Sequence, residues 1–371
     1  MVRALVDGVV FENGGQMGIW RSFYEVMTRL SNQVDYTLLL RSKPVQALPG
    51  GVRLVCDSAR ARAARWNLIG RARKGLGWIP KPRRLPAADV YHSTYFTPCP
   101  KAGVPVVVTV HDMIAERFAL WQHGWPAEQI QIKRTAILSA ALCIAVSKAS
   151  ADDLKLFYPQ VAERIRVVHH GSEHLGRLES TGECQSEPSA GDSFALFVGA
   201  RQNYKNFVTL LDAVRSPLWP PGLYLHVVGG PFYDYEAKFI EISGLTDRVR
   251  MLGPLSDEDL ESQYKAARCL VFPSRMEGFG IPILEAQANA CPVVASDIPV
   301  FREVAGEGAL FFDPRLGEKL AEAVAAACEP GTRCRLIQAG SANIRRFSWD
   351  CAAEQIRAVY EEAAGMPARD G

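Results

Sequence analysis

The sequence predicts an α/β protein made of two Rossmann-like domains, each a doubly wound parallel sheet with helices on its faces. The chain has 371 residues, of which 48% are hydrophobic, so it can bury the cores of two domains of ordinary size. The run VPVVVTV over 104–110 has the continuous apolar character of a strand buried on both faces. Residues 269–301 have the order strand, glycine loop, helix, strand, which is the repeating unit of a parallel sheet.

The domain boundary is predicted at a polar stretch rich in Ser, Gly and Glu. We expect an N-terminal domain over 1–172, a linker over 173–192, a C-terminal domain over 193–346 and a closing helix within 347–371. Ser348 is the expected N-cap of that last helix. Its expected apolar face comprises Ala353, Ile356, Val359 and Tyr360.

The overall composition points to no particular binding partner, because the net charge is only +2. The opening residues MVRALVDGVVFENGG become polar too soon for a signal peptide, and no apolar stretch reaches the ~18 residues needed to span a bilayer. Nine scattered cysteines form no CxxC pair, which favours buried free thiols in a reducing compartment. A cytoplasmic protein is therefore expected.

One basic segment stands apart from this balance. Between Ala59 and Pro86 the chain carries seven arginines and two lysines, with no acid, interleaved with Trp66, Trp78 and several aliphatic residues. A solvated helix and loop is one interpretation. The other is that Arg60–Arg84 contacts anionic lipid headgroups at the inner face of the membrane, or the phosphates of a lipid-linked acceptor. Nucleic-acid binding is not predicted, because no recognised module accompanies the charge.

The expected elements of the N-terminal domain alternate between apolar runs and helical periodicity. The predicted strands are Val2–Val10, Tyr36–Leu40, Asp89–His92, Val104–Val110, Ala140–Ser147 and Ile165–His169, and the predicted helices are Ile19–Leu30 and Lys148–Phe157. Ser147 is the expected N-cap of the second helix.

Two positions in this domain are candidates for ligand contact. A glycine-containing loop, 12–18, joins the first strand to the first helix, where doubly wound sheets often hold phosphates, although most such glycines only make turns. His111-Asp112 follows the strand Val104–Val110, and ligands bind beyond the carboxyl ends of such strands. From its placement alone, His111 fits a structural role equally well.

The C-terminal domain is expected to hold a sheet of its own. Its predicted strands are Phe194–Val198, Leu223–Val228, Val249–Leu252, Cys269–Phe272, one beginning at Pro292, and Ala309–Phe312. Arg201 and Lys205 lie between the first of these strands and a helix that runs to Val214. Two cations there can neutralise a diphosphate, although they can also be surface charges.

The loop after Cys269–Phe272 holds two glutamates with seven residues between them, Glu277 and Glu285. Gly278 and Gly280 lie in the loop, and Pro282 begins the next helix. A helix start preceded by glycines offers N–H groups to a phosphate, and a carboxylate on each side can accept hydrogen bonds from sugar hydroxyls. Alternatively, Glu277 is an ordinary loop acid and Glu285 a surface charge favoured by the helix dipole.

An Asp-x-Asp pattern at Asp257–Asp259 invites a metal-site interpretation. A helix start capped by Ser256, with acids in its first turn, explains these residues better. We therefore predict no metal site and no cofactor.

The stretch Glu277–Glu285, with Gly-Phe-Gly after the first Glu, resembles the signature of glycosyltransferase family 4, and VVASDIPVFREV after it also resembles the family. The resemblance implies the GT-B fold, in which two Rossmann-like domains face each other across a cleft and the terminal helix returns to the N-terminal domain. It also implies metal-independent transfer of a sugar with retention of anomeric configuration.

Residue roles carry over position by position. The resemblance implies that Arg201 and Lys205 neutralise the diphosphate, that Glu277 binds donor-sugar hydroxyls, and that Glu285 binds ribose hydroxyls. Gly278, Phe279 and Gly280, together with Gly15 and Gly18, would surround the donor, and His111 would lie beside the sugar and acceptor.

Three positions depart from the family pattern. Met17-Gly18-Ile19 stands where the family commonly has Gly-Gly-Ile, so Gly18 transfers more securely than Gly15. Ala200 intervenes before Arg201, and His169-His170-Gly171 replaces the family's Asn-Gly.

The predicted function is transfer of a hexose of mannose or glucose type from a nucleoside-diphosphate sugar to a hydroxyl of a glycan or lipid-linked acceptor, in bacterial surface polysaccharide or glycoconjugate assembly. A non-hydrolysing nucleotide-sugar epimerase and an inactive sugar-nucleotide-binding scaffold are the alternatives. The sequence does not decide the base, the sugar, the acceptor or the oligomeric state.

Overall fold

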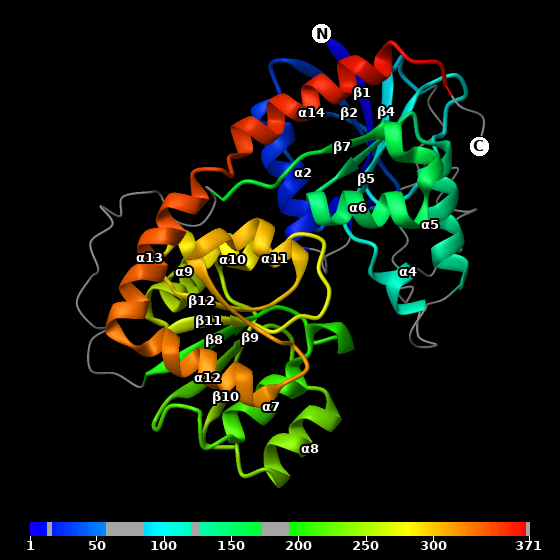
Figure 1. The fold of residues 1–371 in the computed structure, drawn as a ribbon. Helices are drawn as coiled ribbons and strands as arrows, with labels where there is room; N and C mark the ends of the chain where they lie inside the picture. The colour runs from blue at the N-terminus through cyan, green and yellow to red at the C-terminus, as the bar shows by residue number, and fades with distance from the viewer. Residues whose placement is uncertain (13–16, 57–84, 120–126, 173–192, 369–371) are drawn as a thin grey trace. The chain divides into compact units, whose positions relative to one another are not determined.

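The structure is a computed structural model that describes residues 1–12, 17–56, 85–119, 127–172 and 193–368. The chain forms two compact units (Figure 1). Unit 1 comprises Met1–His170 and Trp349–Gly371, and unit 2 comprises Gly171–Ser348. The last helix of the chain therefore belongs to the same unit as the N-terminus. The predicted linker, 173–192, lies outside the described residues.

Unit 1 is built on a seven-stranded parallel sheet with the order β3-β2-β1-β4-β5-β6-β7. Its strands are β1 (Val2–Asp7), β2 (Val34–Leu40), β3 (Arg53–Cys56), β4 (Val90–Ser93), β5 (Val106–Val110), β6 (Leu142–Ala145) and β7 (Ile165–Val167). The order reverses direction between β1 and β4, and this switch point is where doubly wound sheets bind ligands.

Helices cover both faces of this sheet. They are α1 (Val9–Glu12), α2 (Met17–Arg29), α4 (Ile114–Ala119), α5 (Ala127–Ser139), α6 (Lys148–Phe157) and α14 (Trp349–Ala364), with the 3₁₀ turn η1 at Pro159–Arg164. Alternate residues of β5 and β6 point to opposite faces: Val107 and Ile144 pack with α2 and α14, whereas Val108 and Cys143 pack with α5 and α6.

The C-terminal helix α14 lies along α2 (Figure 1). Its buried face includes Ala353, Ile356, Val359 and Tyr360, as the periodicity predicted. Tyr360 also makes a polar contact, because its hydroxyl is 2.7 Å from Nδ1 of the fully buried His92 on β4. Nε2 of His92 is 2.8 Å from Oγ1 of Thr109 on β5, so a chain of hydrogen bonds joins α14 to two central strands.

Unit 2 has a six-stranded parallel sheet with the order β10-β9-β8-β11-β12-β13. Its strands are β8 (Phe194–Val198), β9 (Tyr224–Val228), β10 (Val249–Gly253), β11 (Cys269–Phe272), β12 (Val293–Ser296) and β13 (Ala309–Phe312). The order reverses between β8 and β11, which places a second switch point in this unit.

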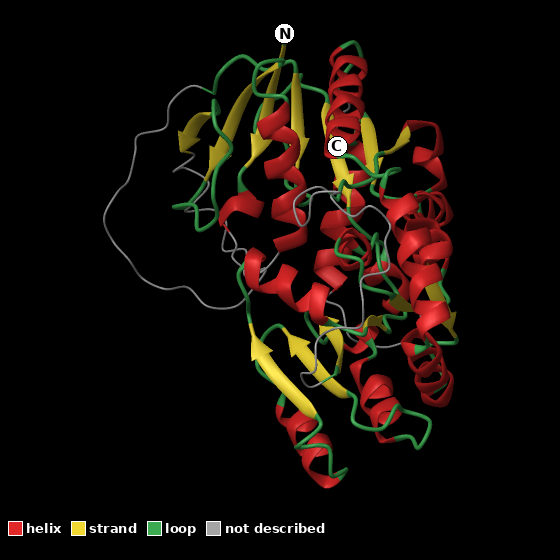
Figure 2. Ribbon diagram, turned by 90° about the vertical axis from the view of Figure 1, so that its left-hand side faces the viewer, coloured by secondary structure: helices red, strands yellow, loops and turns green. Residues whose placement is uncertain are grey.

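The helices of unit 2 also lie on both faces of its sheet (Figures 1 and 2). They are α7 (Phe207–Arg215), α8 (Asp234–Ile242), α9 (Asp257–Ala266), α10 (Ile281–Ala288), α11 (Pro299–Ala305), α12 (Gly317–Cys328) and α13 (Pro330–Ile344), with 3₁₀ turns η2 (Asn203–Lys205) and η3 (Gly306–Gly308). Residues of α7, α8, α12 and α13 share one core with β8, β9, β11 and β12. Helix α10 packs on α9 and α11, and Phe272 of β11 contacts Phe301 of α11 on that face.

The predicted fold class is confirmed, and several element bounds need correction. The first strand ends at Asp7 rather than Val10, because the Asp7 carboxylate accepts a hydrogen bond from the Val9 N–H and begins a short helix there. Strand β3 was not predicted. The N-caps at Ser147 and Ser256 are confirmed, since each hydroxyl accepts a hydrogen bond from an N–H three residues later.

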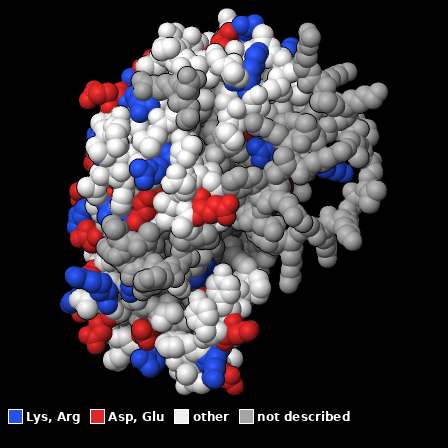
Figure 3. Space-filling view, turned by 90° about the vertical axis from the view of Figure 1, so that its right-hand side faces the viewer, with Lys and Arg blue, Asp and Glu red and all other residues white. Residues whose placement is uncertain are grey.

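Surface charge in the described residues is mixed in sign. On the face that Figure 3 shows, lysine and arginine side chains are interspersed with aspartate and glutamate. No helix within the described ranges has the length and apolarity to cross a membrane. Asp257–Asp259 begins α9, and no metal-binding group of three or more His, Cys, Asp or Glu residues occurs where the structure is described.

Candidate functional site

Two predicted site residues of unit 2 meet at its switch point. Lys205 follows β8 and Glu277 follows β11, and these two strands are neighbours in the sheet. The Lys205 ammonium Nζ donates to Oε1 of Glu277 at 2.5 Å, and both side chains keep some exposure, 16% and 11%. An ammonium and a carboxylate held side by side can together bind an anionic oxygen and a neutral hydroxyl.

The backbone around Lys205 is fixed by its neighbour Asn206. This residue takes the left-handed conformation, with φ of 58°, and separates η2 from α7. Its buried side-chain amide donates to the carbonyls of Pro273 at 3.1 Å and Pro314 at 2.7 Å. The N–H of Arg275 donates to the Tyr204 carbonyl at 2.7 Å, so the loops after β8 and β11 are tied together on both sides of the Lys205–Glu277 pair.

Helix α10 starts at a glycine with a special conformation. Gly280 has φ of 106°, and a Cβ at this position would lie 3.2 Å from the Phe301 ring. Pro282 lies in the first turn, as predicted, although the helix begins at Ile281 and ends at Ala288. Phe279, just before it, is buried and contacts Phe347 edge-on at 5.8 Å. The helix start is therefore held in place from both sides.

Glu285 lies inside α10 and is 8% exposed. Its Oε2 accepts a hydrogen bond of 2.8 Å from the hydroxyl of Tyr264 on α9. Burial and the neighbouring carboxylate raise the pKa of Tyr264 well above its usual value, so that hydroxyl stays protonated and donates. The interpretation of Glu285 as a surface charge is wrong, because the residue is buried. Tyr264 was not singled out from the sequence.

Arg201 takes part in a different network from Lys205. It is 3% exposed, and its Nε donates to Oε2 of Glu236 at 2.9 Å. Nη2 donates to the Pro231 carbonyl, and the guanidinium lies within 6 Å of the rings of Phe207, Phe232 and Tyr233. Nη1 is buried without a hydrogen-bond partner in the described residues. Its charge is thus already countered by a carboxylate, which the sequence did not indicate.

Gly229 allows the turn after β9 to pass close to Arg201 and to the turn after β8. It has φ of 150°, and a Cβ there would lie 2.5 Å from the Gly199 carbonyl oxygen and 3.5 Å from Arg201 Nη1. Only glycine allows the turns after β8 and β9 to lie against each other in this way.

In unit 1, His111 lies at the carboxyl end of β5, as predicted. Its Nε2 is 3.1 Å from the carbonyl oxygen of Thr94, so this nitrogen carries the proton. Burial lowers the pKa of His111 to about 4, and the ammonium of Lys133 contributes in the same direction. The imidazole is therefore neutral at pH 7. Gly18 is exposed in the first turn of α2, and Gly15 lies outside the described residues.

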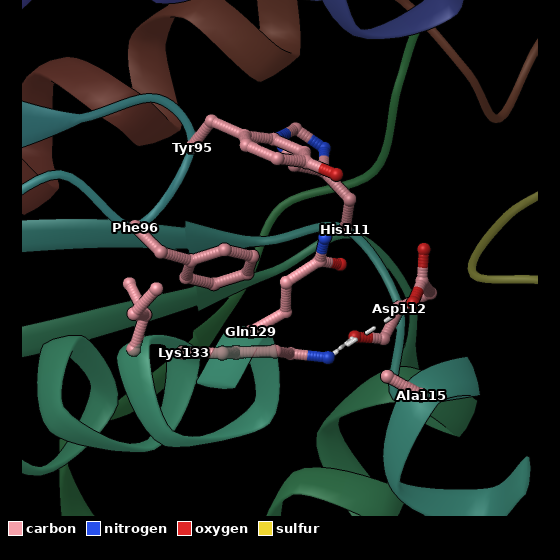
Figure 4. Close-up of a pocket in the computed structure, with 8 residues that line it drawn as sticks. Tyr95, Phe96, His111, Asp112, Ala115, Gln129 and Lys133 are labelled. Atoms are coloured by element: carbon pink, nitrogen blue, oxygen red, sulfur yellow. Dashed lines mark hydrogen bonds and ion pairs between the residues drawn. The ribbon is translucent and has the colours of Figure 1, made fainter. Parts of the chain in front are cut away.

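His111 is one of the residues around a pocket of about 80 Å³ in unit 1 (Figure 4). The lining residues are Tyr95, Phe96, His111, Asp112, Ala115, Gln129, Ile132 and Lys133. They come from the loop after β4, the turn after β5 and the helices α4 and α5. This pocket combines aromatic surface with a few polar groups, as small-molecule sites generally do.

Asp7 orders the loop after β4, which contributes Tyr95 and Phe96 to this pocket, and it was not singled out from the sequence. Its buried carboxylate accepts hydrogen bonds from the N–H of Thr94 at 2.6 Å and the hydroxyls of Thr94 and Thr97, both at 2.5 Å. Thr94 in turn receives the hydrogen bond from His111. Asp7 thereby fixes the loop that orients the imidazole.

Comparison with known proteins identifies both halves of the chain. The family model described as Glycosyltransferase Family 4 matches residues 17–173, and that described as Glycosyl transferases group 1 matches residues 184–342. A D-inositol 3-phosphate glycosyltransferase from Actinosynnema mirum is 30% identical over 303 residues, which are 74% of this chain and 72% of that protein. The O-antigen chain mannosyltransferase B of Escherichia coli is 30% identical over 233 residues, 59% of this chain.

The match spans 60% of the length of the E. coli protein. Solved structures resemble the chain over nearly its whole length: sucrose-phosphate synthase from Thermosynechococcus elongatus has a TM-score of 0.73 at 17% identity, covering 98% of this chain and 99% of that one. Anabaena Alr3699/HepE in complex with UDP-glucose has a TM-score of 0.70 at 16% identity, covering 98% and 100%. The glycosyltransferase WaaG, involved in lipopolysaccharide biosynthesis, has a TM-score of 0.69 at 15% identity, covering 96% and 99%. At these identities the likeness shows the GT-B fold. Taken with the sequence matches, it shows that the chain belongs to glycosyltransferase family 4, the glycosyl transferases group 1 family.

Proposed function

We propose that this chain is a retaining glycosyltransferase that moves a hexose from a nucleoside-diphosphate sugar to an acceptor hydroxyl. The observation that carries the proposal is the Lys205–Glu277 pair beside the start of α10, because it joins a cation, a carboxylate and a helix N-terminus at one switch point. Donor binding by a neighbour of the same fold, whose structure is a complex with UDP-glucose, supports the choice of donor class.

In this proposal the residues of unit 2 hold the donor. Lys205 contacts the diphosphate, and Glu277, released from Lys205, accepts hydrogen bonds from hydroxyls of the sugar. The backbone of Gly278, Phe279 and Gly280 lies against the phosphates at the start of α10. Glu285 accepts hydrogen bonds from the ribose, with Tyr264 fixing its carboxylate.

Arg201 has a supporting role in this scheme. Because its guanidinium is paired with Glu236 and held to the Pro231 carbonyl, it contributes positive potential at the end of β8 and orders the turn after β9. Because Nη1 is buried as well, Arg201 is proposed to act on the diphosphate through its charge rather than through direct contact.

The transfer would take place on one face of the sugar. The bond between the anomeric carbon and the diphosphate oxygen breaks, the acceptor oxygen forms its bond on the same face, and the acceptor proton passes to the departing diphosphate. The Lys205 ammonium stabilises the charge that develops on that diphosphate. We propose that this cation, rather than a metal ion, supplies the stabilisation.

The residues of unit 1 are assigned to the acceptor side. His111 is neutral and is oriented by its hydrogen bond to the Thr94 carbonyl. It is therefore assigned a hydrogen-bonding and positioning role rather than that of a general acid. Gly18, in the first turn of α2, is proposed to allow close approach of the ligand, and Gly15 is assigned the same role from the sequence alone.

Mannose and glucose are the proposed sugars, and surface polysaccharide or glycoconjugate assembly is the proposed setting. Relatives named as O-antigen and serotype-specific mannosyltransferases favour mannose, and the UDP-glucose complex of a structural neighbour favours glucose. We place the protein in the cytoplasm. Contact of Arg60–Arg84 with anionic membranes is a prediction from composition, which flotation with acidic liposomes at low salt tests.

An assay of nucleoside-diphosphate release tests the central proposal. UDP-glucose, UDP-galactose and GDP-mannose would each be incubated with and without a panel of glycoside acceptors. We expect release that depends on the acceptor for donors of one base, and a product whose anomeric configuration, read by proton NMR, matches that of the donor. Isomerisation of the sugar without transfer, or binding without turnover, would contradict the proposal.

A further inference from the structure

The pocket beside His111 is lined by the aromatic rings of Tyr95 and Phe96 and by one acidic and one basic side chain. The rings of Tyr95 and Phe96 lie 5.5 Å apart at an angle of 49°, and both contribute to its lining (Figure 4). Phe96 has φ of 58°, a left-handed conformation that a bulky side chain rarely adopts. The hydrogen bonds from Thr94 and Thr97 to Asp7, on either side of it, hold the loop in this form. Strain of this kind is concentrated at functional sites.

The one lysine or arginine among the described lining residues is Lys133, and its charge is already countered. Lys133 is 5% exposed, and its Nζ donates to Oε2 of the buried Glu116 at 2.8 Å and to the Asp112 carbonyl at 2.6 Å. The other oxygen of Glu116 accepts a hydrogen bond from the Tyr158 hydroxyl at 3.2 Å. Both members of this ion pair are fixed by protein partners, so little of the ammonium charge is left for a ligand.

Asp112 contributes a negatively charged carboxylate to the lining of the pocket. Its side chain is 39% exposed, lines the pocket, and lies 3.9 Å from the Lys133 ammonium. Its Oδ1 accepts a hydrogen bond from the Ile114 N–H at 3.0 Å, which fixes the carboxylate at the start of α4. Counting Lys133, Glu116 and Asp112, the site has one positive and two negative formal charges. Gln129 adds a neutral amide to the lining.

From this arrangement we infer that the pocket takes an uncharged, hydroxyl-bearing ring, such as a pyranoside or a cyclitol, and discriminates against the same ring carrying a phosphate. This inference rests on the proposed function, because it names the acceptor class of that reaction. The hydroxyls find acceptors in the Asp112 carboxylate and the neutral His111, and the ring packs on Tyr95 and Phe96. A phosphate would meet a fixed carboxylate and no unpaired cation among the described lining residues.

Binding of matched ligand pairs tests the inference without a donor. Saturation-transfer NMR would compare methyl α-mannoside, methyl α-glucoside and myo-inositol, each with its phosphate monoester. We expect at least one neutral ligand to bind, and its phosphate ester to bind about tenfold more weakly or worse, the effect of one uncompensated charge contact. Equal or tighter binding of the ester, or no binding of any neutral ligand, would overturn the inference.

Two variants test whether this pocket causes the difference in affinity between each neutral ligand and its phosphate ester. Asp112→Asn keeps the oxygen that accepts from Ile114 but removes the charge, and it should bring the affinities of each pair closer together. Asp152→Asn, on the exposed face of α6, removes the same charge elsewhere in unit 1 and should leave the ratio unchanged. An unaltered ratio in Asp112→Asn would also overturn the inference. Because nucleotide release is measured separately, a transferase that prefers a phosphorylated acceptor would refute this inference and leave the proposed function standing.

Discussion

At the scale of single residues, the proposed donor site depends on the ion pair between Lys205 and Glu277. Both side chains are partly exposed, so the pair can open when a ligand offers better partners. By contrast, the Arg201–Glu236 pair is almost fully buried and is surrounded by three aromatic rings. The sequence places Arg201 and Lys205 four residues apart in one loop, and the family resemblance assigns both to the diphosphate, although Ala200 before Arg201 departs from the family pattern. Burial distinguishes the two in the structure, because Lys205 is partly exposed and Arg201 is held inside the unit.

Removing the amine of Lys205 should damage turnover far more than folding. We expect Lys205→Ala to lower kcat by roughly 10²-fold or more, by analogy with the loss of one charge-stabilising donor at the site of developing charge. Steady-state nucleotide release measures this effect. Lys319→Ala removes an exposed lysine of the same unit, paired with Glu322, and is expected to retain full activity. Near-normal turnover in folded Lys205→Ala would refute the assigned role.

Removing Glu236 should instead damage stability. Glu236→Ala leaves the Arg201 guanidinium buried without its counter-charge, and breaking a buried pair in this way costs about 3–5 kcal/mol. Urea denaturation followed by circular dichroism measures the change. Glu241→Ala, on the exposed side of the same helix, should cost less than about 0.5 kcal/mol. Similar midpoints for the two variants would show that the pair contributes little.

For the candidate site, the sequence predicted which strand each residue follows. Lys205 and Glu277 follow two strands that a doubly wound order makes neighbours, so their meeting follows from topology. The partners of Glu285 and Arg201 could not be foreseen, because Tyr264 and Glu236 come from helices whose packing no local pattern specifies. The same limit explains why Lys133 and Asp7 were missed: each acts through contacts distant in sequence.

At the scale of elements, helix α14 shows how a chain end can complete a distant core. Its apolar periodicity predicted a buried face, and that face packs with α2 and the strands of unit 1. The pattern could not predict that Tyr360 would reach His92 with its hydroxyl. Short elements were the least predictable, since α1 depends on the hydrogen bond from Val9 to Asp7 and β3 spans only four residues.

Tyr360→Phe tests the polar part of this docking. The substitution keeps the ring in place but leaves Nδ1 of fully buried His92 without the hydroxyl partner, which costs about 1–3 kcal/mol. Thermal and urea denaturation, followed by signals from unit 1, would measure this loss of stability. Glu361→Ala, which removes an exposed ion pair with Arg357 on the same helix, serves as the control and should cost under about 1 kcal/mol. If the two variants are equally stable, the buried hydrogen bond is not important for docking.

At the scale of the whole molecule, each unit has its own sheet and core, and two buried histidines make unit 1 sensitive to acid. Burial lowers the pKa of His92 to about 3 and that of His111 to about 4. Both values lie below the ordinary value of 6.5, so the unfolded chain binds more protons than the folded one between about pH 4 and 6.5. Stability is therefore fully present above pH 6.5 and is lost as the pH falls.

Urea unfolding between pH 7.5 and about 5.5 should reveal this dependence. Each histidine is expected to contribute a loss of about 1.4 kcal/mol for every pH unit below 6.5. The loss should appear in probes confined to unit 1, such as the indole N–H resonances of Trp20 and Trp349, which both lie in its core. A free energy of unfolding that stays constant over this range would mean that the two histidines are accessible to protons in the folded state.

The most direct test of the central claim, that unit 2 binds the donor's diphosphate through Lys205, is calorimetric titration of nucleoside-diphosphate sugars into three proteins. The wild type should bind donors of one base saturably. Lys205→Ala should bind them at least about tenfold more weakly, as expected for loss of a charged contact, and Lys319→Ala should match the wild type. Undiminished binding by Lys205→Ala, or no binding of any donor to the wild type, would contradict the account.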